Sequence, residues 1–321
     1  MSDILENERV LRIGRSEFVA DGIRSFELVD PAGESLPPFT AGAHIRLRTP
    51  AGAVRKYSLC NDPSERHRYV IAVKRDELGR GGSLSLVNDA VDGDLLPVGP
   101  PENAFRMSRA ARNLLFIAGG IGITPILSMI RSLQEQPEVH WKLVYLSRSR
   151  ETTAFLQDLA ELGRPGQVKV HHDGGDPHGA LDLWPWLEKP QPGQHIYCCG
   201  PRPLMDGVRD MTGHWPSGRV HFESFTDGTV ARKDDRPFTV HLARSGKSVL
   251  VPVGRSILEA AREAGCEIAA SCESGTCGTC RTRLLAGEAD HRDMVLMPEE
   301  QNSQIMVCVS RAAGDDLTLD L

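Results

Sequence analysis

A fully apolar segment runs into a glycine-rich turn at Leu114-Leu115-Phe116-Ile117-Ala118-Gly119-Gly120-Ile121-Gly122-Ile123-Thr124-Pro125. Leu114 to Ala118 is typical of a short strand buried on both faces of a parallel sheet. An amphipathic stretch to Gln134 follows, so the turn lies where a helix N-terminus and backbone amides can bind a pyrophosphate. Glycines also occur simply in tight turns, and the spacing departs from the full G-x-G-x-x-G pattern.

The same alternation of strand and helix continues to about residue 226. Strands are predicted at Lys142 to Ser147, Val168 to His172, Ile196 to Cys199 and Val220 to Phe222, with a helix at Thr153 to Leu162. Five strands suffice for one nucleotide-binding half of a doubly wound α/β fold. A second turn, Cys199-Gly200-Pro201, also follows a strand. Both turns should therefore lie at the carboxyl edge of one parallel sheet.

The chain before Arg106 has a different pattern of apolar and polar residues. Short alternating runs such as Ile45 to Arg48 and Tyr69 to Lys74 predict strands of an antiparallel barrel or sandwich. Arg55-Lys56-Tyr57-Ser58 ends one strand, and Gly79-Arg80-Gly81-Gly82-Ser83 opens a short helical run. An arginine, a hydroxyl and a glycine-rich helix start can hold a phosphate, and Tyr57 offers a flat face to a ring. A surface arginine and a hairpin tyrosine are the alternative.

A third region follows the polar stretch Thr226 to Arg236, which is typical of a linker. A hairpin is expected from Phe238 to Leu242 and Val249 to Val253, and a helix from Ser256 to Ala264 that ends at Gly265. Two further strands are expected around Met306 to Val309 and Leu317 to Leu321.

The cysteines give the strongest chemical signal. Cys272-x4-Cys277-x2-Cys280, followed by Cys308, has the spacing of a plant-type [2Fe–2S] site. A tight loop would supply three thiolates and a neighbouring strand the fourth, while small residues let backbone amides point at the sulfurs. Zinc and buried thiols are the alternatives, but zinc prefers two separated pairs, and only Cys277 and Cys280 form one. Cys60 and Cys266 are expected to be small core residues.

Length, charge and hydropathy bound the protein class. The 321 residues suffice for two or three domains. The net charge of −6 argues against nucleic acid as the main partner, because binding phosphates needs an excess of basic residues. No run of ~18 apolar residues occurs, and MSDILENERV lacks the pattern of a signal peptide. We therefore expect a cytoplasmic protein that binds neither membrane nor nucleic acid.

Several motifs occur in a fixed order along nearly the whole chain. They are Arg55-x-Tyr57-Ser58, Gly81-Gly82-Ser83, the Gly119 to Pro125 loop, Cys199-Gly200-Pro201 and the C-terminal cysteine set, whose stretch from Ser271 to Arg292 includes Glu288-Ala289-Asp290-His291-Arg292. In this order they resemble the phthalate dioxygenase reductase family, within the ferredoxin–NADP reductase superfamily. The resemblance implies an FMN-binding antiparallel β-barrel at 1–106 and an NAD-binding α/β parallel-sheet domain at 107–226. It further implies a linker at 227–236 and an α+β ferredoxin domain of β-grasp type, with a [2Fe–2S] cluster, at 237–321.

The resemblance also implies roles for single residues. Arg55 and Ser83, beside Gly81 and Gly82, match positions that hold the flavin phosphate. Tyr57 resembles the residue packed on the isoalloxazine ring, and Ser58 the residue near flavin N5. The remaining matches are the flavin-lining strand Ala72, Val73 and Lys74; the nucleotide loop Gly119, Gly120 and Gly122; Thr124, where flavin and nicotinamide meet; Cys199, Gly200 and Pro201 beside the nicotinamide; Phe225, which ends this domain near the flavin; and the cluster ligands Cys272, Cys277, Cys280 and Cys308.

The carriers suggest an order of electron transfer. NADH gives two electrons as hydride, a [2Fe–2S] cluster accepts one, and a flavin can take two and release them singly, so it belongs between them. The hydride step needs no general acid or base, and no catalytic residue is nominated. His171, His172 and Asp173 are expected to be a solvated strand end. Arg148 and Arg150 could bind the 2′-phosphate of NADPH, but Glu151 opposes it and the resembling reductases use NADH, which we expect here.

The acceptor is expected to be another protein, because the chain has no motif for an organic substrate. The family resemblance implies a separate Rieske-type terminal oxygenase of an aromatic-ring dioxygenase or demethylase system, served by a monomeric reductase. A cytochrome P450 or another haem protein is the alternative acceptor. A flavin oxidase or nitric-oxide-detoxifying reductase would not need the cysteine region, and a simple electron carrier would not need the glycine loops.

Overall fold

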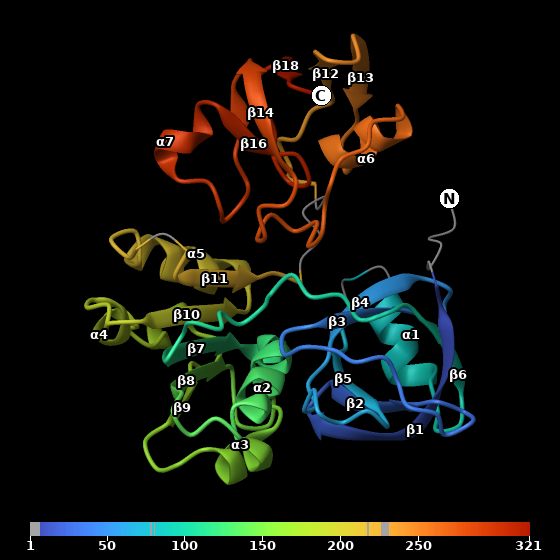
Figure 1. The fold of residues 1–321 in the computed structure, drawn as a ribbon, viewed down its shortest axis with the longest axis vertical. Helices are drawn as coiled ribbons and strands as arrows, with labels where there is room; N and C mark the ends of the chain where they lie inside the picture. The colour runs from blue at the N-terminus through green and yellow to red at the C-terminus, as the bar shows by residue number, and fades with distance from the viewer. Residues whose placement is uncertain (1–6, 78, 80, 217, 226–230) are drawn as a thin grey trace. The chain divides into compact units, whose positions relative to one another are not determined.

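The structure is a computed structural model that describes residues 7–77, 79, 81–216, 218–225 and 231–321 (Figure 1). It divides into two compact units, Met1–His221 and Phe222–Leu321. No helix in the described part of the chain is both long and apolar enough to cross a lipid bilayer.

The first unit begins with a six-stranded antiparallel sheet in the order β4-β3-β6-β1-β2-β5. An isolated bridge between Leu59 and Ile71 closes this sheet into the predicted barrel. Helix α1 follows β5. The bounds are β1 (Arg9–Ala20), β2 (Ile23–Val29), β3 (His44–Arg48), β4 (Val54–Ser58), β5 (Tyr69–Lys74), α1 (Gly82–Asp89) and β6 (Leu95–Val98).

A five-stranded sheet in the order β11-β10-β7-β8-β9 completes the first unit. Strands β10, β7, β8 and β9 pair in parallel, as predicted. The predicted helix at Thr153 starts late, at Leu156, because Thr153 hydrogen-bonds to Ser149 and Phe155 has a left-handed backbone. The bounds are β7 (Asn113–Gly119), α2 (Ile123–Ser132), β8 (His140–Ser147), α3 (Leu156–Leu162), β9 (Val168–His172), α4 (Trp184–Leu187), β10 (Gln194–Cys199), α5 (Arg202–Met211) and β11 (Val220–Glu223), with 3-10 turns at Gly120–Gly122 and Pro177–Gly179.

One hydrophobic core joins the barrel to the parallel sheet. Ile23, Cys60 and Ala72 of the barrel region pack in the same buried cluster as Phe116 of β7 and Met129 of α2. Cys60 is fully buried, as expected of a small core residue. The barrel also has a core of its own, which includes Phe26, Ile45 and Leu47. The two layers of the first unit are therefore packed together without solvent between these residues.

The second unit is a mixed sheet in the order β13-β12-β18-β14-β16, with β12 parallel to β18 and α6 packed against β13. This is the α+β arrangement expected of a β-grasp ferredoxin. Ser256 and Glu259 form a capping box at the start of α6. The bounds are β12 (Phe238–Leu242), β13 (Lys247–Val251), α6 (Ile257–Glu263), β14 (Arg281–Ala286), β15 (Ala289–Asp290), α7 (Pro298–Gln301), β16 (Gln304–Met306), β17 (Arg311–Ala312) and β18 (Asp316–Leu319).

Three strand predictions in this unit need correction. β13 occupies Lys247–Val251 rather than Val249 to Val253, because the hairpin pairs Leu242 with Lys247 and ends at Phe238 with Val251. β16 ends at Met306, because the Ser310 amide turns back to the Met306 carbonyl, and this places Cys308 in a turn. β18 ends at Leu319, where its pairing with β12 stops.

A largely buried cluster of charges, here named the ionic anchor, holds residues 232–238 against the rest of the second unit. It consists of Asp235, Asp290, Arg292 and Arg311. Arg292 donates to Asp235 at 2.5 Å and to Asp290 at 2.7 Å, and Arg311 donates to the Arg236 carbonyl at 3.0 Å. The Asp235 side chain is 4% exposed. Part of the predicted linker is thus docked, while its residues 226–230 lie outside the described residues.

Candidate cofactor sites

The four predicted cluster cysteines are brought together in the second unit. The Cys272 thiol is hydrogen-bonded to those of Cys277 and Cys308, and the Cys308 thiol also to that of Cys280. No three His, Cys, Asp or Glu side chains in the described residues are arranged to hold a single metal ion. The thiol contacts instead run in a chain through all four cysteines, which is the donor set that a two-iron cluster needs.

Backbone amides of the cysteine loop point at sulfur, as the small residues predict. The amides of Ser274 and Thr276 each donate to Cys272 Sγ at 3.4 Å. Hydrogen bonds from the Cys277 and Cys308 thiols, helped by these donors, hold the pKa of Cys272 well below its usual range. Gly275 has φ +75°, and a Cβ there would lie 2.7 Å from Val309. The loop therefore needs glycine both for its backbone and for its packing against the Cys308 turn.

The predicted phosphate site also assembles, at the start of α1. A Cβ on Gly82 would lie 3.0 Å from Arg55 Nε, so the guanidinium of β4 rests against the first turn of the helix. Gly81, the N-cap, has φ +81°. Ser83 Oγ accepts from the Asp76 amide at 3.3 Å. An arginine beside free helix amides is a fitting site for a phosphate group. Arg80, in the same turn, lies outside the described residues.

Two buried hydroxyls at the end of β4 make no hydrogen bond to the described residues. They are Tyr57 Oη and Ser58 Oγ. Burial, opposed by the nearby Arg55 charge, raises the pKa of Tyr57 to about 12. Buried polar atoms without partners are rare in folded proteins, so a bound group with polar atoms fits here. Ala72 and Val73 of the adjacent strand β5 are buried, while Lys74 is exposed.

The two predicted nucleotide turns meet at the carboxyl edge of the parallel sheet. A Cβ on Gly122 would lie 2.2 Å from the Cys199 carbonyl oxygen, and one on Gly119 would lie 2.6 Å from Pro201. A Cβ on Gly200 would lie 2.9 Å from Gly119 Cα. The glycines at these positions thus let two loops touch. Thr124, buried in the first turn of α2, donates its hydroxyl to the Ile121 carbonyl at 3.0 Å.

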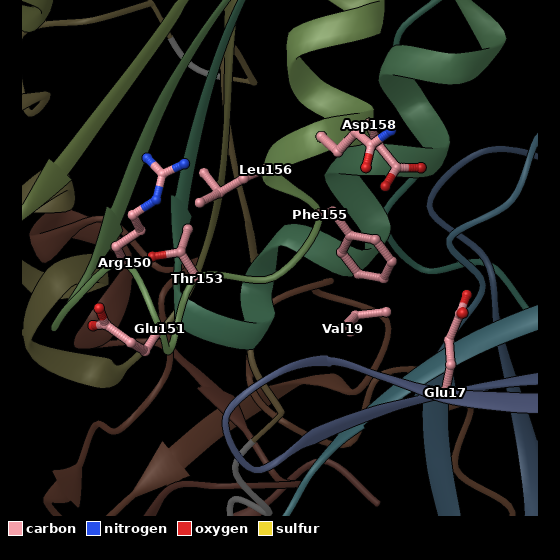
Figure 2. Close-up of a pocket in the computed structure, with 9 residues that line it drawn as sticks. Glu17, Val19, Arg150, Glu151, Thr153, Phe155, Leu156 and Asp158 are labelled. Carbon is pink, nitrogen blue, oxygen red and sulfur yellow. The ribbon is translucent and has the colours of Figure 1, made fainter.

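A groove of about 500 Å³ lies between β1 and the loop that follows β8 (Figure 2). Glu151 and Arg150 lie on that loop, and Phe155 projects toward Val19 of β1. The lining carries more carboxylates than cations, and it includes Arg150 and Glu151, two of the residues that bear on the choice between NADH and NADPH. Hydrogen bonds from Ser149 and from its own backbone amide hold the pKa of Glu151 below its usual value, so it stays ionised near Arg150.

Two features of the site were not predicted from the sequence. Ser128 and Arg131 of α2 hydrogen-bond to the segment that follows β4, and the helical spacing of Thr124, Ser128 and Arg131 could have indicated one shared face. The ionic anchor joins residues far apart in the sequence, so no local sequence pattern predicted it.

Phe225, 47% exposed, belongs to the second unit, and its predicted position near the flavin stays a prediction.

Comparisons with known proteins agree with this geometry. Residues 116–210 match the oxidoreductase NAD-binding domain family, and residues 240–313 match the 2Fe-2S iron-sulfur cluster binding domain family. The reductase subunit of phthalate 4,5-dioxygenase from Pseudomonas putida is 56% identical over 94% of each chain. The solved structure of phthalate dioxygenase reductase, described as passing electrons from pyridine nucleotides to [2Fe-2S], shares 53% identity over 98% of both chains, with a TM-score of 0.73.

A haem protein also contains a similar module. An intact self-sufficient cytochrome P450 monooxygenase shares 36% identity with a TM-score of 0.73, covering 98% of this chain and 41% of its own.

The fold and sites together define an oxidoreductase that joins an NAD-binding domain to a 2Fe-2S domain for electron transfer. The chain belongs to the phthalate dioxygenase reductase family.

Proposed function

We propose that this protein takes hydride from NADH onto FMN and passes the electrons singly through a [2Fe–2S] cluster to a separate Rieske-type terminal oxygenase. The observation that carries the proposal is the pairing of two sites in one compact unit. The Arg55 and α1 site lies in the barrel, and the glycine loops lie at the sheet edge packed against it. The four converging thiols supply the next carrier.

The side chains act by holding and orienting their ligands. Arg55, Ser83 and the α1 amides would bind the flavin phosphate, while Tyr57, Ser58 and strand residues Ala72 to Lys74 would line the ring. Gly119, Gly120 and Gly122 would admit the NADH pyrophosphate close to the backbone, with Thr124 and Cys199 beside the nicotinamide. When bound, the flavin supplies the change from two-electron to one-electron transfer. Cys272, Cys277, Cys280 and Cys308 would hold the cluster.

Visible spectroscopy tests the cofactor set. The purified protein should show flavin and iron–sulfur bands together, and anaerobic NADH should bleach both. Acid should release FMN, because a short glycine-rich turn before Ser83 can close on a terminal phosphate. Release of FAD, or the absence of either set of bands, would contradict the proposal.

The acceptor is tested by reconstitution. Members of the family include a reductase subunit of phthalate 4,5-dioxygenase, which supports an oxygenase of aromatic compounds. The P450 that contains a similar module supports a haem acceptor as the second candidate. NADH-driven product formation with Rieske oxygenases and not with haem proteins is the expected result. Coupled turnover with only a haem protein would overturn this part of the proposal.

We also propose the segment limits 1–106, 107–226, 227–236 and 237–321, a monomeric state and a cytoplasmic location. The matched ranges 116–210 and 240–313 fall inside two of these segments. Four convergent thiols available for iron favour a reducing compartment. Sedimentation of the holoprotein should give the mass of one chain.

A further inference from the structure

One face of helix α2 connects the nucleotide loop to the flavin strands. Thr124, Ser128 and Arg131 are spaced by four and three residues, so they lie on one side of the helix. The Ser128 hydroxyl, fully buried, donates to the Asn61 carbonyl at 2.9 Å. Arg131 Nη1 donates to the Cys60 carbonyl at 2.6 Å. Two successive carbonyls after β4 are therefore held by one helix.

The Cys60–Asn61 segment is also bound on its other side to β5. The Cys60 amide donates to the Val70 carbonyl at 2.9 Å, and Asn61 Oδ1 accepts from the Val70 amide at 2.9 Å. Asn61 Nδ2 donates to the Arg68 carbonyl at 3.2 Å. This segment thus joins the end of β4, with Tyr57 and Ser58, to the start of β5, which continues to Ala72 and Lys74. Both strands are the ones assigned to the flavin.

Arg131 is held in place by a second partner. Its Nη2 donates to Asp158 of α3, while Nη1 makes the contact with Cys60. The Arg131 side chain is 19% exposed, so the guanidinium is largely shielded from water. A planar guanidinium can make both contacts at once from separate nitrogens, which a lysine ammonium cannot do with the same geometry.

We propose that Ser128 and Arg131 are positioning residues for hydride transfer. The N-terminus of α2 carries the loop that receives the nicotinamide, and its second and third turns hold the segment between the two flavin strands. One rigid helix thereby sets the distance between donor and acceptor. A shift of about 1 Å at such a junction can lower a rate about a hundredfold, so two lost hydrogen bonds matter beyond stability. This inference rests on the proposed flavin and NADH sites.

The test compares Ser128→Ala with Ser132→Ala in the holoprotein. Ser132 lies on the same helix, but its hydroxyl donates at 2.8 Å to the Met129 carbonyl of α2 itself. Flavin reduction is followed by stopped flow across NADH concentrations. Ser128→Ala should lower the limiting rate about tenfold, with the half-saturating NADH concentration changed less than threefold, because the nucleotide loop is intact. Ser128→Thr, which keeps the hydroxyl, should recover most of the rate, and Ser132→Ala should match the unsubstituted protein.

A second measurement keeps the proposal falsifiable without turnover. Hydrogen exchange of the Cys60 and Val70 amides should accelerate in Ser128→Ala and in Arg131→Lys, and not in Ser132→Ala. Asp158→Asn should lower the limiting rate in the same direction but less, in case Arg131 variants fold poorly. Equal limiting rates and equal exchange in Ser128→Ala and Ser132→Ala would overturn the inference. An unsubstituted protein without flavin, or with flavin that NADH does not reduce, would instead contradict the proposed function.

Discussion

Cys272 is the residue at which most of the cluster site's contacts meet. It is hydrogen-bonded to two other thiols and accepts hydrogen bonds from two backbone amides, and it follows Ser271 at the start of the loop. These hydrogen bonds favour the thiolate form of Cys272. Because all these groups lie in the second unit, a change here should leave the flavin and NADH sites intact.

Replacing any of Cys272, Cys277, Cys280 or Cys308 by Ser should abolish or sharply weaken the [2Fe–2S] cluster. Reduction of the flavin by NADH should survive at its normal rate, because hydride transfer comes earlier. Iron content and the cluster's electron paramagnetic resonance signal measure the first effect, and stopped flow measures the second. Equal loss of cluster and of flavin reduction in a folded variant would contradict the proposed order of transfer.

Glu151 should govern the choice between NADH and NADPH. It stays ionised on the loop that carries Arg148 and Arg150, so its charge would repel a 2′-phosphate bound there. Glu151→Gln should therefore raise kcat/KM for NADPH several-fold, with little change for NADH. Steady-state kinetics with both nucleotides, against Glu161→Gln on the exposed end of α3 as control, provides the measurement. The same gain in kcat/KM for NADPH in both variants would show that the loss of any nearby negative charge, and not of Glu151 in particular, causes it.

For single residues, the sequence predicted the contacts that follow from spacing and from motif order. Cysteines at fixed intervals had to converge if they were to share a cluster, and the four thiols do lie together. Ser128 and Arg131 were missed because their partners after β4 are backbone carbonyls, whose position the sequence does not show. Asp235 was assigned to a linker because its charged neighbours have no periodicity. Its carboxylate nevertheless accepts a hydrogen bond from Arg292, 57 residues later in the chain.

Among the elements, the contact between the β7 and β10 loops is the tightest glycine junction. Gly122→Ala would place a Cβ 2.2 Å from the Cys199 carbonyl oxygen although the backbone itself, with φ −61°, accepts alanine. The loops must separate, so stability should fall by about 2 kcal/mol and NADH should bind more weakly. Thermal unfolding and nucleotide titration measure both. Gly207→Ala on α5, where nothing lies within 4 Å, should instead stabilise by about 0.8 kcal/mol.

The ionic anchor should make the second unit sensitive to loss of one carboxylate. Asp235→Asn leaves Arg292 and Arg311, with side chains 9% and 7% exposed, without their shared charge partner. We expect destabilisation of about 3 kcal/mol at pH 7. Because the Arg292 hydrogen bonds lower the pKa of Asp235, this contribution is present above the ordinary carboxyl pKa of about 4 and is lost as pH falls through the lowered value.

Thermal melts of the cluster-bearing unit, followed by visible circular dichroism between pH 3 and 8, check this expectation. The unsubstituted protein and Asp235→Asn should differ most near neutral pH and converge in acid. Asp234→Asn, a neighbouring exposed carboxylate, should behave like the unsubstituted protein. A constant difference at every pH would rule out the ionic explanation.

Element types were predictable where periodicity is regular. The apolar runs of β7 and β8 and the alternation in β5 gave strands within two residues of their ends. β1 was not recognised, because bulges after Ile13 and Phe18 break its two-residue alternation. The ends of α3, β13 and β16 were wrong because side-chain hydrogen bonds, hairpin register and a local turn fixed them.

Over the whole molecule, charge is distributed unevenly. Phe222–Leu321 contains sixteen Asp and Glu against eleven Lys and Arg, a net charge of −5, out of −6 for the chain. The unit that must deliver electrons outward is thus the acidic one. Such a distribution favours association with a basic surface on the acceptor and raises the rate of encounter at low salt.

Raising ionic strength from about 0.02 to 0.5 M should therefore weaken coupling to the oxygenase. The Debye length shortens from roughly 20 Å to about 4 Å over this range, so kcat/KM for the acceptor should fall at least several-fold. Flavin reduction by NADH at saturating nucleotide, measured in the same buffers, should change much less. Acceptor kinetics that rise with salt, or that follow flavin reduction, would contradict steering by the acidic unit.

The ionic anchor also decides where this chain can be divided. An excised iron–sulfur unit that starts at Phe238 would carry Arg292 and Arg311 buried without Asp235, whereas one that starts before Arg232 keeps the whole cluster of charges. Grafting this unit onto another reductase, or exchanging it between members of the family, therefore requires that the junction fall upstream of Arg232. From Arg232 onward, the connecting segment is therefore part of the iron–sulfur unit.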